Sequence, residues 1–159
     1  MVTRGVFYGI TVILVALLLL SSFTAVYYYS QYGQAESQNR SYVQQLQRLG
    51  VKYNSDILFD FGNGTRAWHN DTLFQPGTNM YVATQIMTGG RNNDTYYPKY
   101  SEHFITAMYN VGDTGNDYWG LWIFNASVWQ MSSAGADEVQ VTNNSVFAWS
   151  YGLNNGTQP

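Results

Sequence analysis

Two acid–histidine pairs are the residues of this chain whose types could support catalysis or metal binding. Asp71 lies two residues after His69, and Glu102 directly precedes His103. The chain has no cysteine, so disulfides and thiolate metal sites are excluded. A metal site would need both pairs to converge in the fold, and neither pair has the spacing of a ligand motif. We therefore expect two histidines at strand edges, no metal and no cofactor.

The sequence also lacks the other patterns that are typical of enzymes. It contains no nucleophile elbow, no phosphate-binding glycine loop and no paired-carboxylate signature. The neighbouring acids Asp137 and Glu138 lie in a predicted turn, where successive side chains point apart. We expect a protein without catalytic activity.

Aromatic residues, which make up 17% of the chain, are the remaining candidates for ligand contacts. On a predicted strand at 118–124, Trp119 and Leu121 alternate with Trp122, so the two sets face opposite sides of a sheet. Two interpretations stay open. Either all five tryptophans fill the core, or some aromatics form an exposed platform for a sugar, a small ligand or a protein. The residues of this candidate platform are Tyr96, Tyr97, Trp122 and Trp129.

Asparagine residues in the pattern Asn-x-Ser/Thr are more frequent than the composition alone would give. One interpretation is that loops rich in Asn and Thr produce this pattern by chance, without any modification. Because acceptor asparagines are modified on exposed loops outside the cytoplasm, we expect an outward-facing glycoprotein. The seven candidate sites are Asn39, Asn63, Asn70, Asn93, Asn125, Asn143 and Asn155.

The N-terminal segment predicts a membrane anchor. No charged residue occurs from Gly5 to Ala35. Residues 6–29 would form a helix of about 36 Å, enough to cross a bilayer core of about 30 Å. We expect 1–29 to hold a cytoplasmic tail and a single transmembrane helix, with the following domain extracytoplasmic. A cleaved signal peptide is the alternative, although its apolar core is shorter and ends in a small-x-small site.

A short helical stalk is expected at 30–50. Four apolar residues near its end have helical spacing, and they would either self-associate or dock on the chain's own domain. Gly50 is expected to end this helix. The four residues are Tyr42, Val43, Leu46 and Leu49.

From residue 51 to 152 the pattern predicts one α+β domain, followed by a flexible tail at 153–159. Asn63-Gly64 is a strong hairpin signal. Thr78 or Asn79 is expected to cap a helix through Thr88, which Gly89-Gly90 ends. This single helix would pack on one face of a mixed sheet, with Tyr81, Val82, Gln85 and Ile86 on one side.

Strands are expected at 57–61, 65–69, 103–109, 118–124, 128–131, 139–142 and 146–151, and a loop at 91–102. The last two strands could also form one hairpin about Asn143-Asn144.

Several short motifs are similar to those of the transcobalamin-like C-terminal domain family, found in membrane-anchored prokaryotic surface proteins, including archaeal ones. They are Pro76-Gly77-Thr78, Tyr118-Trp119-Gly120-Leu121-Trp122, Asn125 at a turn, Gly135-Ala136-Asp137 and Val146-Phe147-Ala148-Trp149. The resemblance covers about 55–151 and implies a β-grasp-like fold. In the cobalamin carriers that contain this domain, the cobalamin lies between it and a helical barrel. Because the sequence contains no such barrel, cobalamin binding does not carry over.

The charge pattern narrows the class of partner. From residue 36 on, ten acidic residues outnumber six basic ones, and no basic stripe is present, so nucleic acid is excluded as an expected partner. We expect a membrane-anchored, glycosylated interaction module that binds a protein partner at the cell surface. The alternatives are a receptor for a small molecule or glycan on the aromatic face, and an accessory subunit of a larger membrane complex.

Overall fold

The computed structural model describes residues 4–112, 117–153 and 159. It divides into two units, residues 1–45 and 46–159, each of which is described by itself. The tail expected at 153–159 falls mostly on residues 154–158, which lie outside the described part of the chain.

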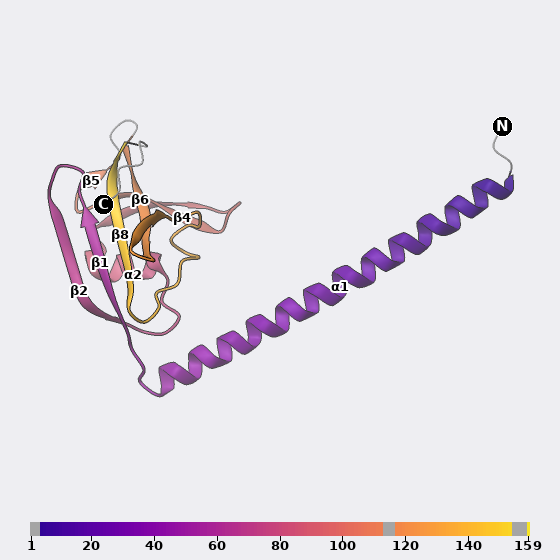
Figure 1. Cartoon of the computed structure of the whole chain (residues 1–159), viewed down its shortest axis with the longest axis horizontal. Helices are drawn as coiled ribbons and strands as arrows, with labels where there is room; N and C mark the ends of the chain where they lie inside the picture. The colour runs from indigo at the N-terminus through magenta and orange to yellow at the C-terminus, as the bar shows by residue number, and fades with distance from the viewer. Residues whose placement is uncertain (1–3, 113–116, 154–158) are drawn as a thin grey trace. The chain divides into compact units, whose positions relative to one another are not determined.

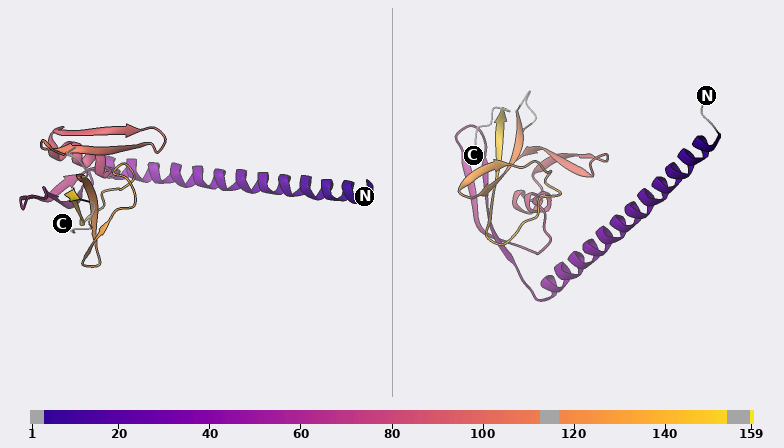
Figure 2. Two further views of the ribbon diagram at one scale, coloured as in Figure 1. Left: turned by 90° about the horizontal axis from the view of Figure 1, so that it is seen from above. Right: turned by 45° about the vertical axis from the view of Figure 1, so that its right-hand side comes forward.

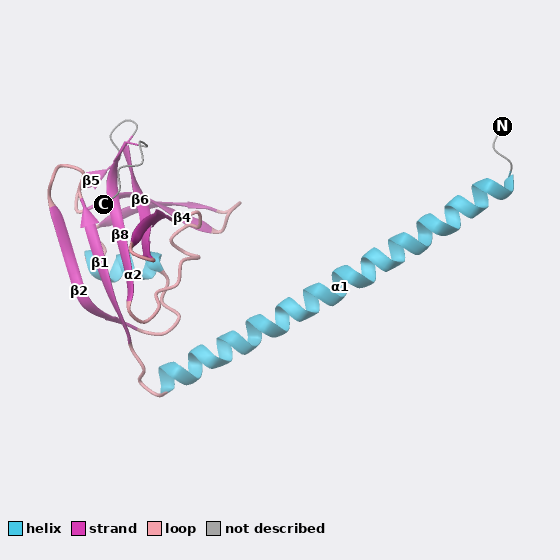
Figure 3. Ribbon diagram, in the orientation of Figure 1, coloured by secondary structure: helices cyan, strands magenta, loops and turns pink. Residues whose placement is uncertain are grey.

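The N-terminal unit is one continuous helix, α1 (Arg4–Arg48), which carries the apolar run directly into the polar segment (Figure 3). The expectation that the segment from residue 30 is helical is thus confirmed as far as Arg48. Hydroxyls within the apolar run are satisfied locally, because Ser22 and Thr24 donate to the carbonyl oxygens of Leu18 and Leu20 at 2.8 Å. The helix is long and apolar enough to cross a membrane, and a signal sequence would share these properties.

Gly50 forms the expected C-terminal cap just after α1. Its backbone is left-handed, with a φ of 69°. The amides of Gly50 and Val51 donate to the carbonyl oxygens of Gln47 and Leu46 at 3.0 and 3.1 Å. This is the Schellman arrangement, which glycine adopts without steric cost.

Five strands form a mixed sheet in the order β2-β1-β8-β6-β7, so the α+β expectation is confirmed (Figure 1). β1 and β8 pair in parallel, and the other neighbours are antiparallel. The Asn63-Gly64 hairpin joins β1 to β2, and the Phe61 amide donates to the Thr65 carbonyl oxygen at 3.0 Å. The strands are β1 (Tyr53–Asp60), β2 (Arg66–Phe74), β6 (Asp117–Asn125), β7 (Val128–Met131) and β8 (Ser145–Leu153).

The segment 139–142 is not a strand of this sheet, and the hairpin expected about Asn143-Asn144 is absent from the described residues. The hydrogen bonds of the segment go to the start of the second helix instead. Val139 accepts from the Met80 amide at 2.8 Å, and the Val141 amide donates to Thr78 at 2.9 Å. Val139 and Val141 therefore belong to an extended segment in which Val141 is buried. This segment does not pair with β8.

A second, three-stranded sheet contains β3 (Asn92–Tyr97), β4 (Glu102–Met108) and β5 (Val111–Gly112). The prediction of a loop at 91–102 is wrong, because β3 pairs with β4 along its whole length. Asn and Asp have low strand propensity, and cross-strand pairing overrides it here. The hairpin of β3 and β4 projects from the rest of the domain (Figure 2).

Helix α2 (Met80–Thr88) has the predicted caps. The Asn79 side chain accepts from the Val82 amide, and Gly89 is left-handed with a φ of 60°. The side of the helix identified from the sequence is not the packed one, because Val82 and Ile86 are 43% and 60% exposed. The buried residues are Met80, Ala83, Thr84 and Thr88. Two of these are threonines, whose hydroxyls bond within the helix and so tolerate burial.

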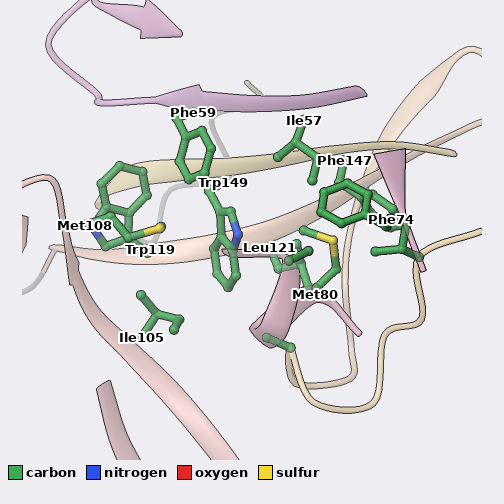
Figure 4. Packing of buried hydrophobic residues seen from close by; sticks show 13 residues of the cluster. Ile57, Phe59, Phe74, Met80, Ile105, Met108, Trp119, Leu121, Phe147 and Trp149 are labelled. Atoms are coloured by element: carbon green, nitrogen blue, oxygen red, sulfur yellow. The ribbon is translucent and has the colours of Figure 1, made fainter. Parts of the chain in front are cut away.

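The main core lies between α2, one face of the five-stranded sheet and β4 (Figure 4). Trp149 of β8 reaches α2, where its indole N–H donates to the Thr84 hydroxyl at 2.8 Å. The opposite face of the sheet carries a smaller cluster of Leu58, Trp122 and Ala148, with Trp129 packed against it. The sheet is therefore buried on both faces near its centre.

Candidate ligand-binding cleft

A cavity of about 390 Å³ opens between β4, the first half of β6 and the segment 131–136. Its volume falls within the usual range of small-molecule sites. Six aromatic residues line it, together with Ile105, Leu121 and Met131. The six are Tyr97, Tyr100, Phe104, Tyr118, Trp119 and Trp149.

The cleft follows an incompletely paired edge of β6. β7 pairs only with residues Trp122–Asn125, and no strand among the described residues pairs with the preceding half on that side. The Ser132 amide donates to the Leu121 carbonyl oxygen at 2.8 Å and closes one end. Because alternate residues direct their backbone groups to the same side, the peptide groups of Trp119 also face this edge.

Two buried tryptophans form the floor. The Trp119 indole N–H donates to the Val111 carbonyl oxygen at 2.9 Å, and that of Trp149 donates to Thr84. Both polar atoms are therefore satisfied inside the protein. The rings are left to offer apolar surface to the cavity.

A clasp between His103 and Asp137 fixes one wall. The Asp137 carboxylate accepts from the His103 amide at 2.6 Å, and its other oxygen lies 3.0 Å from His103 Nδ1. The His103 ring stacks on Tyr81, with centroids 4.0 Å apart and planes 10° apart. The carbonyl oxygen of Asp137 accepts from Asn79 at 3.0 Å. These contacts hold the segment after residue 132 against β4 and the start of α2.

Glu102 lies against Gly135 at the same wall. A Cβ on residue 135 would lie 2.6 Å from the carboxyl carbon of Glu102, so glycine lets the carboxylate approach the backbone. Glu102 is the one carboxylate among the described lining residues, and no lysine or arginine lines the cleft there.

The Tyr81 phenol beside this wall has a pKa above its ordinary value. Burial raises the pKa of Tyr81, and the nearby carboxylates of Asp94 and Asp137 raise it further. A hydrogen bond from the Gln85 amide, 3.1 Å away, lowers the pKa in part. Both carboxylates therefore lie close enough to this wall to act on Tyr81.

The four platform candidates do not share one surface. Tyr97 lines the cleft, and Tyr96 contacts His103 with ring centroids 4.8 Å apart. Trp122 is only 8% exposed and belongs, with Trp129, to the cluster on the opposite face of the sheet. An exposed role for Trp122 is therefore wrong, because the β6–β7 hairpin brings Trp129 against it.

Sequence reasoning missed most of the cleft. Tyr100 and Glu102 lie in the stretch assigned to a loop, so no strand pattern pointed to them. Phe104 lies on the strand expected at 103–109, but nothing in the sequence marked it as a site residue. The Gly135-Ala136-Asp137 motif was the available signal. Its glycine contacts Glu102 and its aspartate holds His103.

The two acid–histidine pairs lie in different sheets. His69 is in β2, where its ring meets that of Phe59 edge-on at 5.5 Å. Asp71 accepts from the Asn54 side chain at 2.8 Å. Among the described residues, no three His, Asp or Glu side chains are grouped to hold a metal ion.

Six of the seven candidate glycosylation sites are exposed, and Asn155 lies outside the described residues. The Asn63 and Asn143 side-chain oxygens accept from the amides of Thr65 and Asn54 at 2.9 and 3.0 Å. These bonds leave Nδ2, the atom that carries a glycan, unused. Exposure is compatible with modification at Asn39, Asn63, Asn70, Asn93, Asn125 and Asn143.

The chain matches no known family profile, and no curated protein matches it. A crystal structure from Ruminococcus gnavus, of a protein described provisionally as metal-binding, is similar over 64% of this chain and 98% of its own. The identity is 12% and the TM-score is 0.46. A likeness this distant carries no argument about function.

Proposed function

We propose that this protein is a membrane-anchored, outward-facing, glycosylated binding module that holds a small ligand in the aromatic cleft. The observation that carries the proposal is the 390 Å³ cavity at the open edge of β6, lined by six aromatic side chains. Concave, largely apolar sites with a few polar groups are typical of ligand binding. The proposal thus favours the receptor alternative over a surface module that binds only a protein.

The order of the strands supports a β-grasp-like domain. β1 and β8 pair in parallel at the centre of the sheet, with β2 beside β1 and the β6–β7 hairpin beside β8. α2 follows the first hairpin, β1–β2. The three-stranded sheet is then an insertion between α2 and β6. In this arrangement the insertion supplies one wall of the cleft through β4.

The exposed surface of α1 supports the anchor. Leu20 and Phe23 are 69% and 75% exposed, and neighbouring apolar side chains are similarly uncovered. A continuous apolar surface of this length is favourable in lipid and costly in water. The exposed acceptor asparagines of the β domain support an outward orientation.

Anchoring and orientation are tested by expressing the full chain in a glycosylating host. We expect it in the membrane fraction after alkaline carbonate washing, with its N-terminal segment intact and its mass lowered by deglycosylation. Thr65→Ala is a matched control, because it removes the Asn63 sequon but keeps the asparagine. We expect this variant to lose only the glycan at Asn63. A soluble product that begins after the apolar run would contradict the anchor. A mass that deglycosylation leaves unchanged would contradict the proposed orientation.

Ligand binding is tested by ¹⁹F NMR of the full chain labelled with 5-fluorotryptophan in dodecyl maltoside. With benzyl alcohol as a neutral aromatic probe, we expect saturable shifts of the Trp119 and Trp149 signals. Trp68, on the surface of β2, is an internal control whose signal should not move. Equal shifts of all five tryptophans, or none, would contradict the cleft. Stoichiometric co-purification of another protein in mild detergent, without such shifts, would favour the accessory-subunit alternative.

A further inference from the structure

We infer that the ligand of this cleft is a small organic cation, an ammonium group held by the aromatic rings and by the Glu102 carboxylate. The inference rests on the proposed function, since it names the chemical class that the same cavity takes. It depends on two independent features, the charge at the wall and the faces of the rings.

The charge of the cleft favours a cation. Glu102 contributes a carboxylate to the lining, and Asp137 lies directly behind His103 at 2.6 Å from its amide. No lysine or arginine is among the described lining residues. Residues 51–159 carry nine acidic against four basic residues, so the surrounding field has the same sign.

The other charge types fit less well. An anion would face the Glu102 carboxylate, and the one imidazole of the described lining, His103, is already paired with Asp137. A neutral apolar ligand would remove water from this carboxylate without replacing its interactions, which is unfavourable. A cation compensates the charge of this half-buried carboxylate and keeps the apolar contacts.

The rings supply the second feature. Tyrosine and tryptophan faces attract cations that lie within about 6 Å of the ring centroid. Two tyrosines of this domain already make such contacts. The Arg91 guanidinium lies 5.0 Å from the Tyr109 ring centre, and the Lys99 ammonium lies 5.2 Å from that of Tyr100. Tyr100 also lines the cleft, so the Lys99 ammonium already lies over one of the lining rings.

The test compares choline with 3,3-dimethyl-1-butanol, a neutral molecule of the same shape, on the labelled full chain in dodecyl maltoside. We expect both probes to shift the Trp119 and Trp149 signals, with choline binding about tenfold more tightly. Glu102→Gln should weaken choline binding about five- to tenfold and leave the alcohol unchanged. Glu138→Gln is the matched control, because it removes an exposed carboxylate outside the lining and should change neither affinity.

The two proposals fail in different ways. Equal affinities for the two probes, or a Glu102→Gln variant that binds choline as well as the wild type, would overturn the cation inference while the cleft remains a binding site. Absence of any shift at Trp119 and Trp149 with choline, dimethylbutanol and benzyl alcohol would overturn the proposed function itself. An equal loss of choline binding in Glu102→Gln and Glu138→Gln would assign the effect to net charge and overturn the role of Glu102.

Discussion

Replacing Trp149 with alanine is expected to lower the free energy of unfolding of the β domain by about 3–5 kcal/mol. The side chain is almost fully buried against α2, where it forms part of the floor of the cleft, and its removal would leave a large cavity. A domain of ordinary stability, about 5–15 kcal/mol, would lose a large share of it. Urea unfolding of the full chain in detergent, followed by the fluorescence of the remaining tryptophans, measures the change.

Thr84→Val separates packing from hydrogen bonding at this site. The substitution keeps the shape of the side chain but leaves the Trp149 indole N–H, now bonded at 2.8 Å, without its acceptor. A buried donor without a partner costs about 1–3 kcal/mol, so Thr84→Val should be destabilising but milder than Trp149→Ala. A loss below about 1 kcal/mol in Trp149→Ala would contradict the central position of this ring in the core.

Asp137→Ala is expected to lower the free energy of unfolding by about 2–4 kcal/mol, because it removes two charge-assisted hydrogen bonds to His103. The loss should also free the segment after residue 132 and widen the cleft. Amide hydrogen exchange at His103 gives a direct readout, since its N–H donates to the carboxylate at 2.6 Å. We expect this amide to exchange faster in the variant.

Two further variants control for charge. Glu138→Ala removes the neighbouring exposed carboxylate and should change neither stability nor the exchange of His103. Asp137→Asn keeps one oxygen for the His103 amide and should be milder than Asp137→Ala. Unchanged exchange in Asp137→Ala, or an equal effect of Glu138→Ala, would contradict the clasp.

The parts of the fold that the sequence predicted correctly depend on local chemistry. The hairpin at Asn63-Gly64, the cap at Asn79 and the helix ends at Gly50 and Gly89 each follow from a few adjacent residues. Glycine and asparagine adopt the backbone angles that these turns and caps require. Such signals are complete within a single short segment, so one sequence suffices to find them.

The parts that it predicted wrongly depend on distant pairing. β3 is a strand because β4 lies beside it. The segment 139–142 is not a strand of the sheet, because its hydrogen bonds go to Thr78 and to Met80 at the start of α2. The parallel pairing of β1 with β8 joins residues about 90 positions apart, such as Ser55 and Ser145. Hydrophobic alternation gives the buried face of a strand but not the identity of its neighbour.

The same distinction holds for the candidate site. Alternation correctly placed Trp119 and Trp122 on opposite faces of the sheet. It did not predict that Trp129 packs against Trp122 and buries that second face. The wall of the cleft needs Glu102, Gly135 and Asp137 side by side, although more than 30 residues separate the first from the others. No spacing rule links these residues. Only the folded backbone brings them together.

The parallel pairing of β1 and β8 has a mechanical consequence. α1 leads into the start of β1, while the chain leaves the sheet at the end of β8. A pull between these two points slides the two strands past one another along their length and loads the six paired positions from Ser55 to Asp60 together. Hydrogen bonds loaded in shear must break nearly at once, whereas those of a hairpin pulled at its open end break one after another. A domain tethered through α1 would therefore resist extension at its centre, and it would lengthen only after the β1–β8 ladder had given way.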